Sequence, residues 1–294
     1  MIRHPRQIAA NVAMIDSLRK SQGHKYDHGH ALVLSGGAGR TGAARLAAQG
    51  ALRIGAGLVT LGVPPSAQLE VASHITAVML KRIEDEGALT AHLQDHRING
   101  LCLGPGLGLK RARSLVPAAL AIPALDSRSV VLDADALTSF ADAPDALFKM
   151  LHGRCVLTPH AGEFARLFPD IAKTLDAATT KTPELSKTQA TCEAAARAGC
   201  VVLFKGPETV IAAPDGRCAI NSAQHCAAPW LATAGSGDVL AGFITGLLAR
   251  GFDPFQAAQT AAFVHMKCAQ SFGPGLIAED LPNEVPNVFR DLGV

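Results

Sequence analysis

The chain alternates short apolar runs with longer helical patterns, and this alternation constrains its fold more than any other feature. The helical patterns include a run from Gly42 to about Ile54 and another over residues 185–199. Strands that alternate with helices in this way predict a doubly wound, mostly parallel sheet with helices on both faces. The predicted strands are 31–35, 57–63, 99–104, 129–134, 154–159 and 200–206.

One segment departs from the alternation. Residues 209–221 contain two apolar runs joined by Pro214, Asp215 and Gly216, a pattern that predicts a hairpin. The chain has no long linker, internal repeat or low-complexity tract. We therefore expect an α/β fold with a single domain.

Composition and charge exclude several classes of protein. Hydrophobic residues make up 48% of the chain, and the net charge of +2 offers no basis for binding nucleic acid or a membrane surface. The apolar segment 246–269 contains glycine, proline and polar residues, so it predicts two packed helices rather than a membrane span. The cysteines lack zinc-site spacing and the N-terminus lacks a signal-peptide pattern, so we expect free thiols and a cytoplasmic location.

Glycine-rich and polar segments follow the predicted strands. Ligands of doubly wound sheets bind in the crevice beyond the carboxyl ends of the strands, so these segments form the candidate site. They are SGGAGRTG (35–42), GPGLG (104–108), DAD (133–135), TPHAGE (158–163), KGPET (205–209) and, before a late helix, ATAGSGD (232–238).

The first of these segments matches the dinucleotide-binding pattern G-x-G-x-x-G at Gly37, Gly39 and Gly42. That site also needs an acidic residue after the next strand to hold the ribose. The first acid after the strand at 57–63 is Glu70, inside a predicted helix. A Rossmann oxidoreductase is therefore disfavoured, although backbone N–H groups at this helix start could still face an anion.

The segment 232–242 carries the most specific chemistry. Its small residues let the backbone approach a phosphate, and the N-terminal N–H groups of the following helix favour an anion there. Asp238 lies in the first turn of that helix. It is either a helix-start acid or the base that takes a proton from a hydroxyl during phosphoryl transfer.

Together these segments resemble one family. GSGD at the start of a late helix is similar to the anion hole and catalytic aspartate of the ribokinase superfamily, and the whole set resembles its NAD(P)HX dehydratases. The resemblance implies a ribokinase-like domain over 24–294, preceded by an N-terminal helical extension over 1–23. That extension is too short for the epimerase domain often fused to this family, so we expect a separate epimerase. The matching segments, in family order, are 24–61, 104–108, 131–137, 156–167, 202–216 and 232–242.

The resemblance also implies roles for individual residues. Asp238 is the expected catalytic base and contacts the hydrated cofactor. The other implied substrate-binding residues are Ala43, Gly106 and His160. The implied anion hole is Ala234, Gly235, Ser236 and Gly237, and the implied nucleotide-binding residues are Lys205, Gly206, Pro207, Glu208, Thr209 and Gly237.

The implied reaction returns the S form of hydrated NADH or NADPH to NAD(P)H. Phosphate transferred from ADP, or from ATP, turns the hydroxyl of the hydrate into a good leaving group. Mg²⁺ is expected to bridge the nucleotide phosphates without a direct protein ligand. The compact chain resembles bacterial members that favour ADP, so we expect ADP as the donor, and we expect a homo-oligomer.

Several residues have two interpretations. Asp133 and Asp135 either cap a helix or line the site, and Glu163 either favours a helix start or reaches a metal or phosphate through water. His160 alone could be a capping or surface histidine. Lys205 either stabilises a phosphate with its charge or contributes only its backbone. No role beyond packing is predicted for His225, His265 and Trp230.

Two further functions remain open. A ribokinase-superfamily kinase acting on hydroxyethylthiazole or a hydroxymethylpyrimidine would share the GSGD helix. Such a kinase is not expected to carry the TPHAGE and DADAL segments at this spacing. A non-catalytic adenylate-binding sensor would keep the nucleotide pocket and would not need Asp238.

Overall fold

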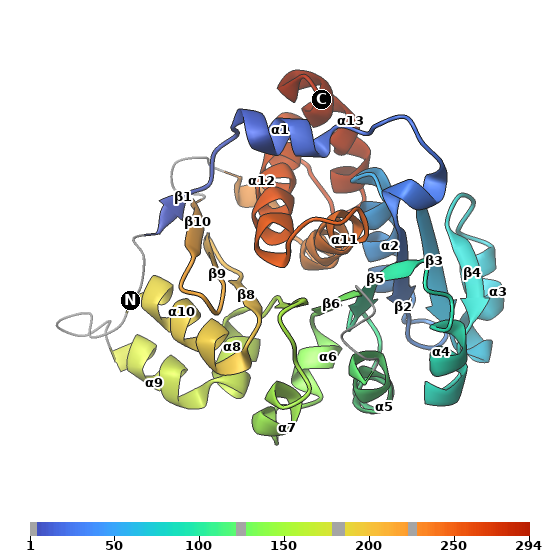
Figure 1. The fold of residues 1–294 in the computed structure, drawn as a ribbon, viewed down its shortest axis with the longest axis horizontal. Helices are drawn as coiled ribbons and strands as arrows, with labels where there is room; N and C mark the ends of the chain where they lie inside the picture. The colour runs from blue at the N-terminus through green and yellow to red at the C-terminus, as the bar shows by residue number, and fades with distance from the viewer. Residues whose placement is uncertain (1–4, 122–127, 178–185, 223–227) are drawn as a thin grey trace.

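The predicted doubly wound sheet is present in the computed structural model, which describes residues 5–121, 128–177, 186–222 and 228–294. His225 and Leu185, where one predicted helix begins, lie outside these ranges. The described residues form a ten-stranded sheet with helices on both faces (Figure 1). The strand order is β1-β10-β9-β8-β7-β6-β5-β2-β3-β4.

All six strands predicted from apolar runs are confirmed, and each runs parallel to its neighbours within this set. The predicted hairpin is also confirmed, because β9 (Glu208–Ala212) and β10 (Cys218–Ser222) pair antiparallel. The six strands are β2 (His30–Leu34), β3 (Leu58–Val63), β5 (Ile98–Leu103), β6 (Ser129–Leu132), β7 (Cys155–Leu157) and β8 (Val201–Phe204).

Two edge strands were not predicted. β1 (Arg6–Gln7) pairs with β10, and β4 (Met79–Arg82) pairs with β3, both in parallel. β1 has only 2 residues, and most of β4 is exposed. Neither strand therefore contains the buried apolar run from which the others were predicted.

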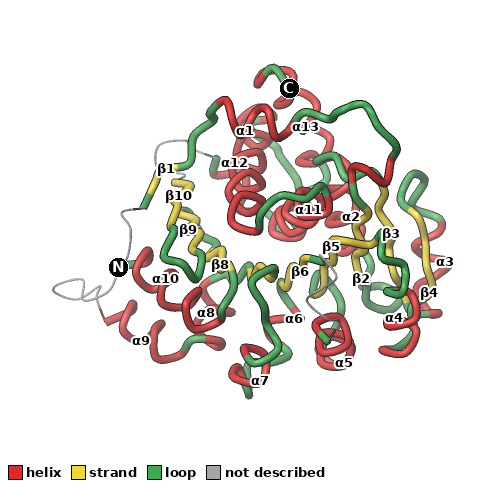
Figure 2. Tube along the Cα trace, in the orientation of Figure 1, coloured by secondary structure: helices red, strands yellow, loops and turns green. Residues whose placement is uncertain are grey.

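The helices form one layer on each face of the sheet (Figures 1 and 2). One layer contains α1 (Val12–Leu18), α2 (Gly42–Arg53), α3 (Gln68–Ala72), α11 (Ser236–Ala249), α12 (Pro254–Phe272) and α13 (Asp280–Leu292). The other contains α4 (Glu86–His92), α5 (Leu109–Leu120), α6 (Asp135–Thr138), α7 (Pro144–Phe148), α8 (Ala161–Leu167), α9 (Pro169–Ala177) and α10 (Lys187–Ala198). The helical patterns at 42–54 and 246–269 are confirmed by α2 and by the pair α11 and α12.

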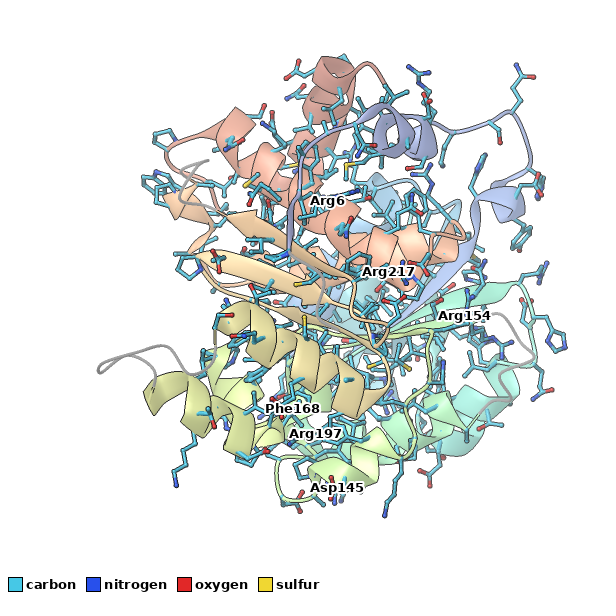
Figure 3. All side chains as sticks on the ribbon, turned by 60° about the vertical axis from the view of Figure 1, so that its left-hand side comes forward. Arg6, Asp145, Arg154, Phe168, Arg197 and Arg217 are labelled. Carbon is cyan, nitrogen blue, oxygen red and sulfur yellow. The ribbon has the colours of Figure 1, made fainter. Side chains whose placement is uncertain are left out.

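Successive residues of a strand pack into opposite layers, as the pleat requires. In β2, Val33 belongs to the core on the α2 side, whereas Leu32 and Leu34 belong to the core on the α5 side. In the second core, Phe168, which is labelled in Figure 3, stacks on Phe148 with ring centroids 5.1 Å apart. Both faces of the sheet are thus buried, which explains the continuous apolar runs in the sequence.

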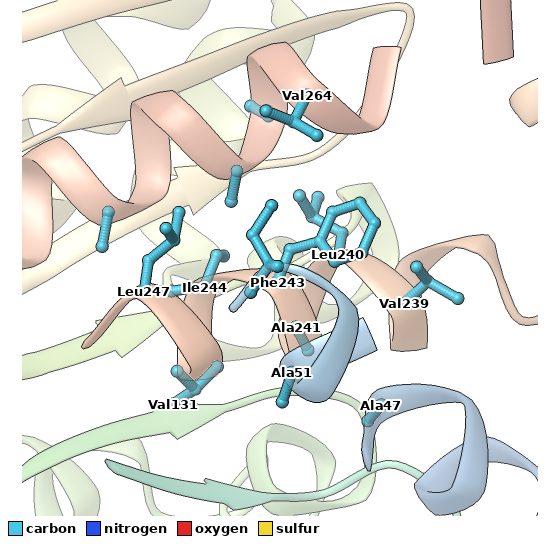
Figure 4. Close-up of a cluster of buried hydrophobic side chains, with 14 of the residues drawn as sticks. Ala47, Ala51, Val131, Val239, Leu240, Ala241, Phe243, Ile244, Leu247 and Val264 are labelled. Carbon is cyan, nitrogen blue, oxygen red and sulfur yellow. The ribbon is translucent and has the colours of Figure 1, made fainter. Parts of the chain in front are cut away.

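Helix α11 is buried on nearly all sides, between the sheet, α2 and α12 (Figure 4). Its glycines permit a close approach to α2. A Cβ at Gly242 would lie 2.1 Å from the carbonyl oxygen of Ala47, and one at Gly246 would lie 2.5 Å from that of Ala51. The two helices that start beside the candidate site are therefore packed backbone to backbone.

The N-terminal segment also contacts this body. Met14 and Leu18 of α1 are buried in the core on the α2 side. The domain boundary expected at residue 24 stays a prediction. In the described part of the chain, no helix combines the length and apolar character needed to cross a bilayer.

Candidate active site

The predicted site residues follow the carboxyl ends of the parallel strands. Gly106 and His160 lie just beyond β5 and β7, and Lys205 follows β8 directly. Ala43 is the second residue of α2, which follows the loop after β2. Asp238 is the third residue of α11. Because the strands are parallel, these segments converge on one edge of the sheet, where ligands of such folds bind.

Two predicted substrate residues lie together. Gly106 has φ of +62°, and a Cβ there would lie 2.6 Å from the carbonyl oxygen of Arg40 and 3.4 Å from Cβ of Ala43. On the other side of this contact, a Cβ at Gly36 would lie 2.1 Å from the carbonyl oxygen of Gly106. The glycine-rich loop after β2 and the GPGLG loop therefore touch through their backbones, a contact that larger residues would prevent.

Glu70 supports the glycine-rich loop, a role that was not predicted. One carboxylate oxygen accepts a hydrogen bond from the backbone N–H of Gly39 at 2.7 Å, and the other accepts one from the Thr41 hydroxyl. These two bonds hold the pKa of Glu70 below its usual value. The first acid after β3 thus lies in α3 and supports the glycine-rich loop, and it does not stand at the strand end where a Rossmann site needs its ribose-binding acid.

Lys205 lies among the predicted acids. Its Nζ is 2.6 Å from Oδ1 of Asp133, which is 1% exposed, and 4.0 Å from Oε2 of Glu163. Burial acts to lower the pKa of Lys205, but the two carboxylates outweigh it and raise that pKa. The same Nζ would lie 3.5 Å from a Cβ at Gly237. The Lys205 side chain is therefore directed toward the start of α11, which favours the interpretation that uses its charge over the one that uses only its backbone.

Asp238 is poised to exchange a proton near neutral pH. Burial, and then the negative charge of Asp133, raise its pKa to about 7, while Lys205 opposes the shift. A carboxylate that serves as a general base works best when its pKa is close to the working pH. The electrostatics therefore favour a base over a simple helix-start acid.

The predicted anion hole lies at the start of α11. Gly235 is the N-cap with φ of +89°, and no side chain caps the helix there. A Cβ at Gly235 would lie 2.7 Å from Cδ1 of Leu46 in α2 and 2.9 Å from Cβ of Ala278. An N-terminus without a side-chain cap leaves backbone N–H groups for an anion, and the helix dipole favours one.

His160 and Glu163 cap helix α8. The His160 ring accepts a hydrogen bond at Nδ1 from the N–H of Gly162 at 3.0 Å, and Glu163 accepts one from the N–H of His160 at 2.8 Å. Both residues therefore have the helix-start role. Burial raises the pKa of Glu163, whereas the His160 side chain is 55% exposed, with its Nε2 3.4 Å from Oε1 of Glu163.

Asp135 holds the GPGLG loop, since its Oδ2 accepts a hydrogen bond from the N–H of Gly108 at 2.7 Å. The preceding Ala134 has φ of +46°, which is strained for a residue with a side chain. A Cβ at Gly104 would lie 1.6 Å from the carbonyl oxygen of Asp133. Asp133 and Asp135 are thus held at the candidate site by tight backbone packing, and neither serves only as a helix cap.

The predicted nucleotide-binding loop 205–209 is fastened by a second residue that was not predicted. Lys187, at the start of α10, donates hydrogen bonds to the carbonyl oxygens of Lys205, at 3.3 Å, and of Glu208. Burial lowers the pKa of Lys187 to about 8. Within the loop, the Thr209 hydroxyl donates to the carbonyl oxygen of Gly206 at 3.2 Å.

Among the described residues, no three His, Cys, Asp or Glu side chains are grouped closely enough to hold a metal ion directly. A cavity of about 1220 Å³ runs along the outer side of α2 toward Arg250 and Phe289. Among the described residues that line it, Gly42 alone belongs to the glycine-rich and polar segments of the candidate site. The candidate site is therefore the edge of the sheet and not this cavity.

Comparison with known proteins identifies the family. The sequence model of the NAD(P)H-hydrate dehydratase family matches residues 31–285, which is most of the chain. The chain belongs to the NAD(P)H-hydrate dehydratase family. The resemblance drawn from ordered sequence segments is thereby confirmed. This is a family of enzymes, and a solved ribokinase-like superfamily protein from Enterococcus faecalis shares the fold, with a TM-score of 0.76 at 19% identity.

Relatives within this dehydratase family differ in length. The chain is 31% identical to the ADP-dependent (S)-NAD(P)H-hydrate dehydratase of Xanthomonas campestris, over 98% of the chain and 97% of that protein. It is 37% identical to the bifunctional NAD(P)H-hydrate repair enzyme of Moorella thermoacetica, over 93% of the chain and 52% of that protein. The chain spans about half the length of the bifunctional relatives that it matches.

A solved dehydratase shares the whole fold. The ADP/ATP-dependent NAD(P)H-hydrate dehydratase from Bacillus subtilis, co-crystallized with ATP/Mg²⁺, superposes with a TM-score of 0.75 at 26% identity. The match covers 99% of this chain and 100% of that one. The fold described above is therefore shared with a solved member of the dehydratase family.

Proposed function

We propose that this protein dehydrates the S form of hydrated NADH or NADPH to NAD(P)H, with ADP or ATP as phosphate donor. The observation that carries the proposal is Asp238, a half-buried carboxylate with a pKa of about 7 at the uncapped start of α11. The names of family members, among them the ADP-dependent relative from Xanthomonas campestris, support the substrate and the donor. We favour ADP for this chain.

In the proposed mechanism, Asp238 removes the proton from the hydroxyl of the hydrated ring as its oxygen attacks the terminal phosphorus of the nucleotide. The bond from that phosphorus to the nucleotide breaks, and AMP or ADP leaves. Backbone N–H groups of Ala234, Gly235, Ser236 and Gly237 stabilise the charge on the transferring group.

Dehydration follows the transfer. The lone pair of the ring nitrogen expels phosphate with both electrons of the carbon–oxygen bond, and loss of a neighbouring proton restores the dihydropyridine. For each cofactor repaired, the water held in the hydrate leaves as part of inorganic phosphate, and ADP becomes AMP or ATP becomes ADP. The ammonium group of Lys205, 2.6 Å from Asp133, balances the negative charge that gathers around the phosphates.

The substrates would occupy two sides of Asp238. Lys205, Gly206, Pro207, Glu208, Thr209 and Gly237 would hold the nucleotide. Ala43, Gly106 and His160 would hold the hydrated nicotinamide, and the contact between Gly106 and Ala43 supports a shared surface for it. The exposed ring of His160 can reach a ligand while its Nδ1 caps α8.

Magnesium fits this site through water. Asp133, Glu163 and Asp238 face one ammonium group, so the cluster carries excess negative charge when all three are ionised. Mg²⁺ prefers such oxygen ligands and keeps several of its waters. When bound, it would neutralise charge on the nucleotide phosphates. Asp133, Glu163 and Asp238 would hold it through hydration water.

The proposed function also suggests a partner activity, a location and an oligomeric state for this protein. The bifunctional naming of several relatives supports a second activity beside the dehydratase, which we assign to a separate epimerase that supplies the S form. We also propose that the protein works in the cytoplasm as a homo-oligomer.

A comparison of candidate substrates tests this function. Purified protein with ADP and Mg²⁺ should restore absorbance at the dihydronicotinamide band from hydrated NADH, and should not phosphorylate hydroxyethylthiazole or a hydroxymethylpyrimidine. Phosphorylation of either alcohol at a comparable rate would favour the kinase alternative. Nucleotide binding without turnover of any of these substrates would favour the sensor.

A further inference from the structure

A buried histidine lies directly behind the anion hole. His265, on α12, is 7% exposed, and its ring packs edge-on against Phe243 with centroids 6.1 Å apart. Its Nε2 lies 2.9 Å from the carbonyl oxygen of Ser236 and 3.3 Å from the Ser236 hydroxyl. His265 therefore does more than the packing expected from the sequence, because its ring also makes polar contacts with Ser236, the first residue of α11.

The carbonyl contact determines which nitrogen carries hydrogen. A carbonyl oxygen only accepts hydrogen bonds, so Nε2 must be the donor. Burial lowers the pKa of His265 to about 4, against the opposing effect of its bond to Ser236. The ring is thus neutral at physiological pH, with its hydrogen directed at Ser236.

This donor has a consequence for the Ser236 hydroxyl. Because Nε2 carries the hydrogen that it donates to the carbonyl oxygen, it cannot accept one from the Ser236 hydroxyl 3.3 Å away, so the hydroxyl hydrogen remains available for another acceptor. The hydroxyl belongs to the first turn of α11, where no side chain caps the helix. An anion bound at this helix start would receive the serine hydrogen together with the backbone N–H groups.

We propose that His265 is a positioning residue that fixes Ser236, and with it the first turn of α11, in the geometry that binds the transferring phosphoryl group. The ligand class is a phosphate that terminates a nucleoside di- or triphosphate. This inference rests on the proposed function, because it assigns the phosphoryl group to the start of α11.

Three substitutions on α12 test the proposal. His265→Leu removes the donor, and His265→Gln keeps an N–H donor near the same position. Thr260→Val is the matched control, because Thr260 is also buried on α12 and its hydroxyl has no hydrogen-bond partner among the described residues. Thermal melting of each variant shows whether the fold is retained.

We expect His265→Leu to lower kcat by roughly 10- to 100-fold, which is below the loss from deleting a whole oxyanion donor. The KM for hydrated NADH should stay within about 3-fold, because Ser236 is not expected to touch the nicotinamide. The kcat of His265→Gln should lie at least about halfway, on a logarithmic scale, between that of H265L and that of wild type. The kcat of T260V should match wild type. Equal losses in H265L and H265Q with wild-type melting, or a loss confined to KM, would overturn the proposal.

A double-mutant cycle with Ser236→Ala isolates the contact. The factor by which H265L lowers kcat should be at least about 3-fold smaller in the S236A background, since part of its target is gone. An unchanged factor would mean that His265 does not act through the serine hydroxyl and would contradict the proposal.

Nucleotide binding separates this inference from the proposed reaction. Calorimetry should find ADP affinity about 3- to 10-fold weaker in H265L than in wild type and unchanged in T260V. If wild type fails to repair hydrated NADH, the proposed reaction is wrong, yet this affinity difference still supports the role of His265. If ADP binds H265L as tightly as wild type, the positioning role is wrong even when the reaction is right. Should H265L not fold, H265Q and S236A are compared with wild type in the same binding experiment.

Discussion

At the scale of single residues, burial and charge act together on Asp238. The side chain sits near three other acids and one lysine, and the balance of these effects raises its pKa to about 7. A base with this pKa is half ionised at neutral pH and still binds a proton strongly. The same features predict separate effects on turnover, on nucleotide affinity and on stability.

Asp238→Asn should abolish most turnover and spare binding. The amide keeps the size of the side chain and cannot accept the proton, so kcat should fall by roughly 10²- to 10⁴-fold. Removal of a negative charge beside a polyanion should leave ADP affinity, measured by calorimetry, equal or higher. Asp142→Asn is the control, because that side chain is 76% exposed and pairs with Arg113. Near-normal kcat in D238N would redirect the search for the base to Asp133, Asp135 or His160.

Asp238 should also make stability depend on pH. Its pKa in the folded protein is about 7 against 3.8 for an ordinary aspartate. Between these values the folded state binds more protons than the unfolded state, so the free energy of unfolding falls as pH rises. The stability gain of D238N over wild type should therefore be larger at pH 8 than at pH 5, by roughly 1–3 kcal/mol. Urea denaturation at the two pH values measures this, and an equal gain at both would show that the pKa is not raised.

At the scale of helices and strands, the site depends on how closely α2 and α11 approach. Gly50, Gly242 and Gly246 line this contact, and a Cβ on any of them would lie within 3.0 Å of another backbone or side-chain atom. The glycine-rich loop precedes α2, and the anion hole precedes α11. Close packing of the two helices therefore sets the position of one loop relative to the other.

Gly242→Ala tests this packing. Alanine in a helix normally stabilises by about 1 kcal/mol over glycine, but here its Cβ would lie 2.1 Å from the carbonyl oxygen of Ala47. Overpacking should reverse the sign and destabilise by roughly 1–3 kcal/mol or more. Gly87→Ala in α4 is the control, since its Cβ would be 3.5 Å from the nearest atom, and it should raise the melting temperature. A melting temperature for G242A above that of wild type would contradict the packing.

The buried strands of the sheet could be predicted because both of its faces are covered. β2, β3, β5, β6, β7 and β8 are nearly all buried, so each leaves a continuous apolar run in the sequence. β4 could not be predicted this way, because only one of its residues is even partly buried. Its strand structure comes from pairing with β3 at the edge, which has no local signature.

The residues of the candidate site also fall into those that could be predicted from the sequence and those that could not. Asp238, Lys205 and Gly106 stand in short glycine-rich or polar segments, so their place after a strand or at a helix start was readable. Glu70, Lys187 and His265 are held in place by partners far away in the chain; His265 and Ser236, for example, are 29 positions apart. Only the folded chain brings such pairs together, which is why residues that support the site were missed.

At the scale of the whole molecule, the sheet joins two binding surfaces at one edge. The loops after β2, β5 and β7 form the proposed side for the hydrated cofactor, and the loops after β8 and before α11 form the side for the nucleotide. Asp238 lies within electrostatic reach of the ion pair between Lys205 and Asp133. The architecture therefore predicts that each turnover couples one dehydration to the cleavage of one nucleotide.

The most direct test is the stoichiometry of that coupling. Purified protein is mixed with hydrated NADH, ADP and Mg²⁺, and the return of dihydronicotinamide absorbance is followed together with release of phosphate and AMP. We predict one phosphate and one AMP for each NADH restored, and no restoration when ADP or Mg²⁺ is left out. Restoration of NADH at the same rate without nucleotide, or without matching phosphate release, would contradict phosphoryl transfer at the start of α11.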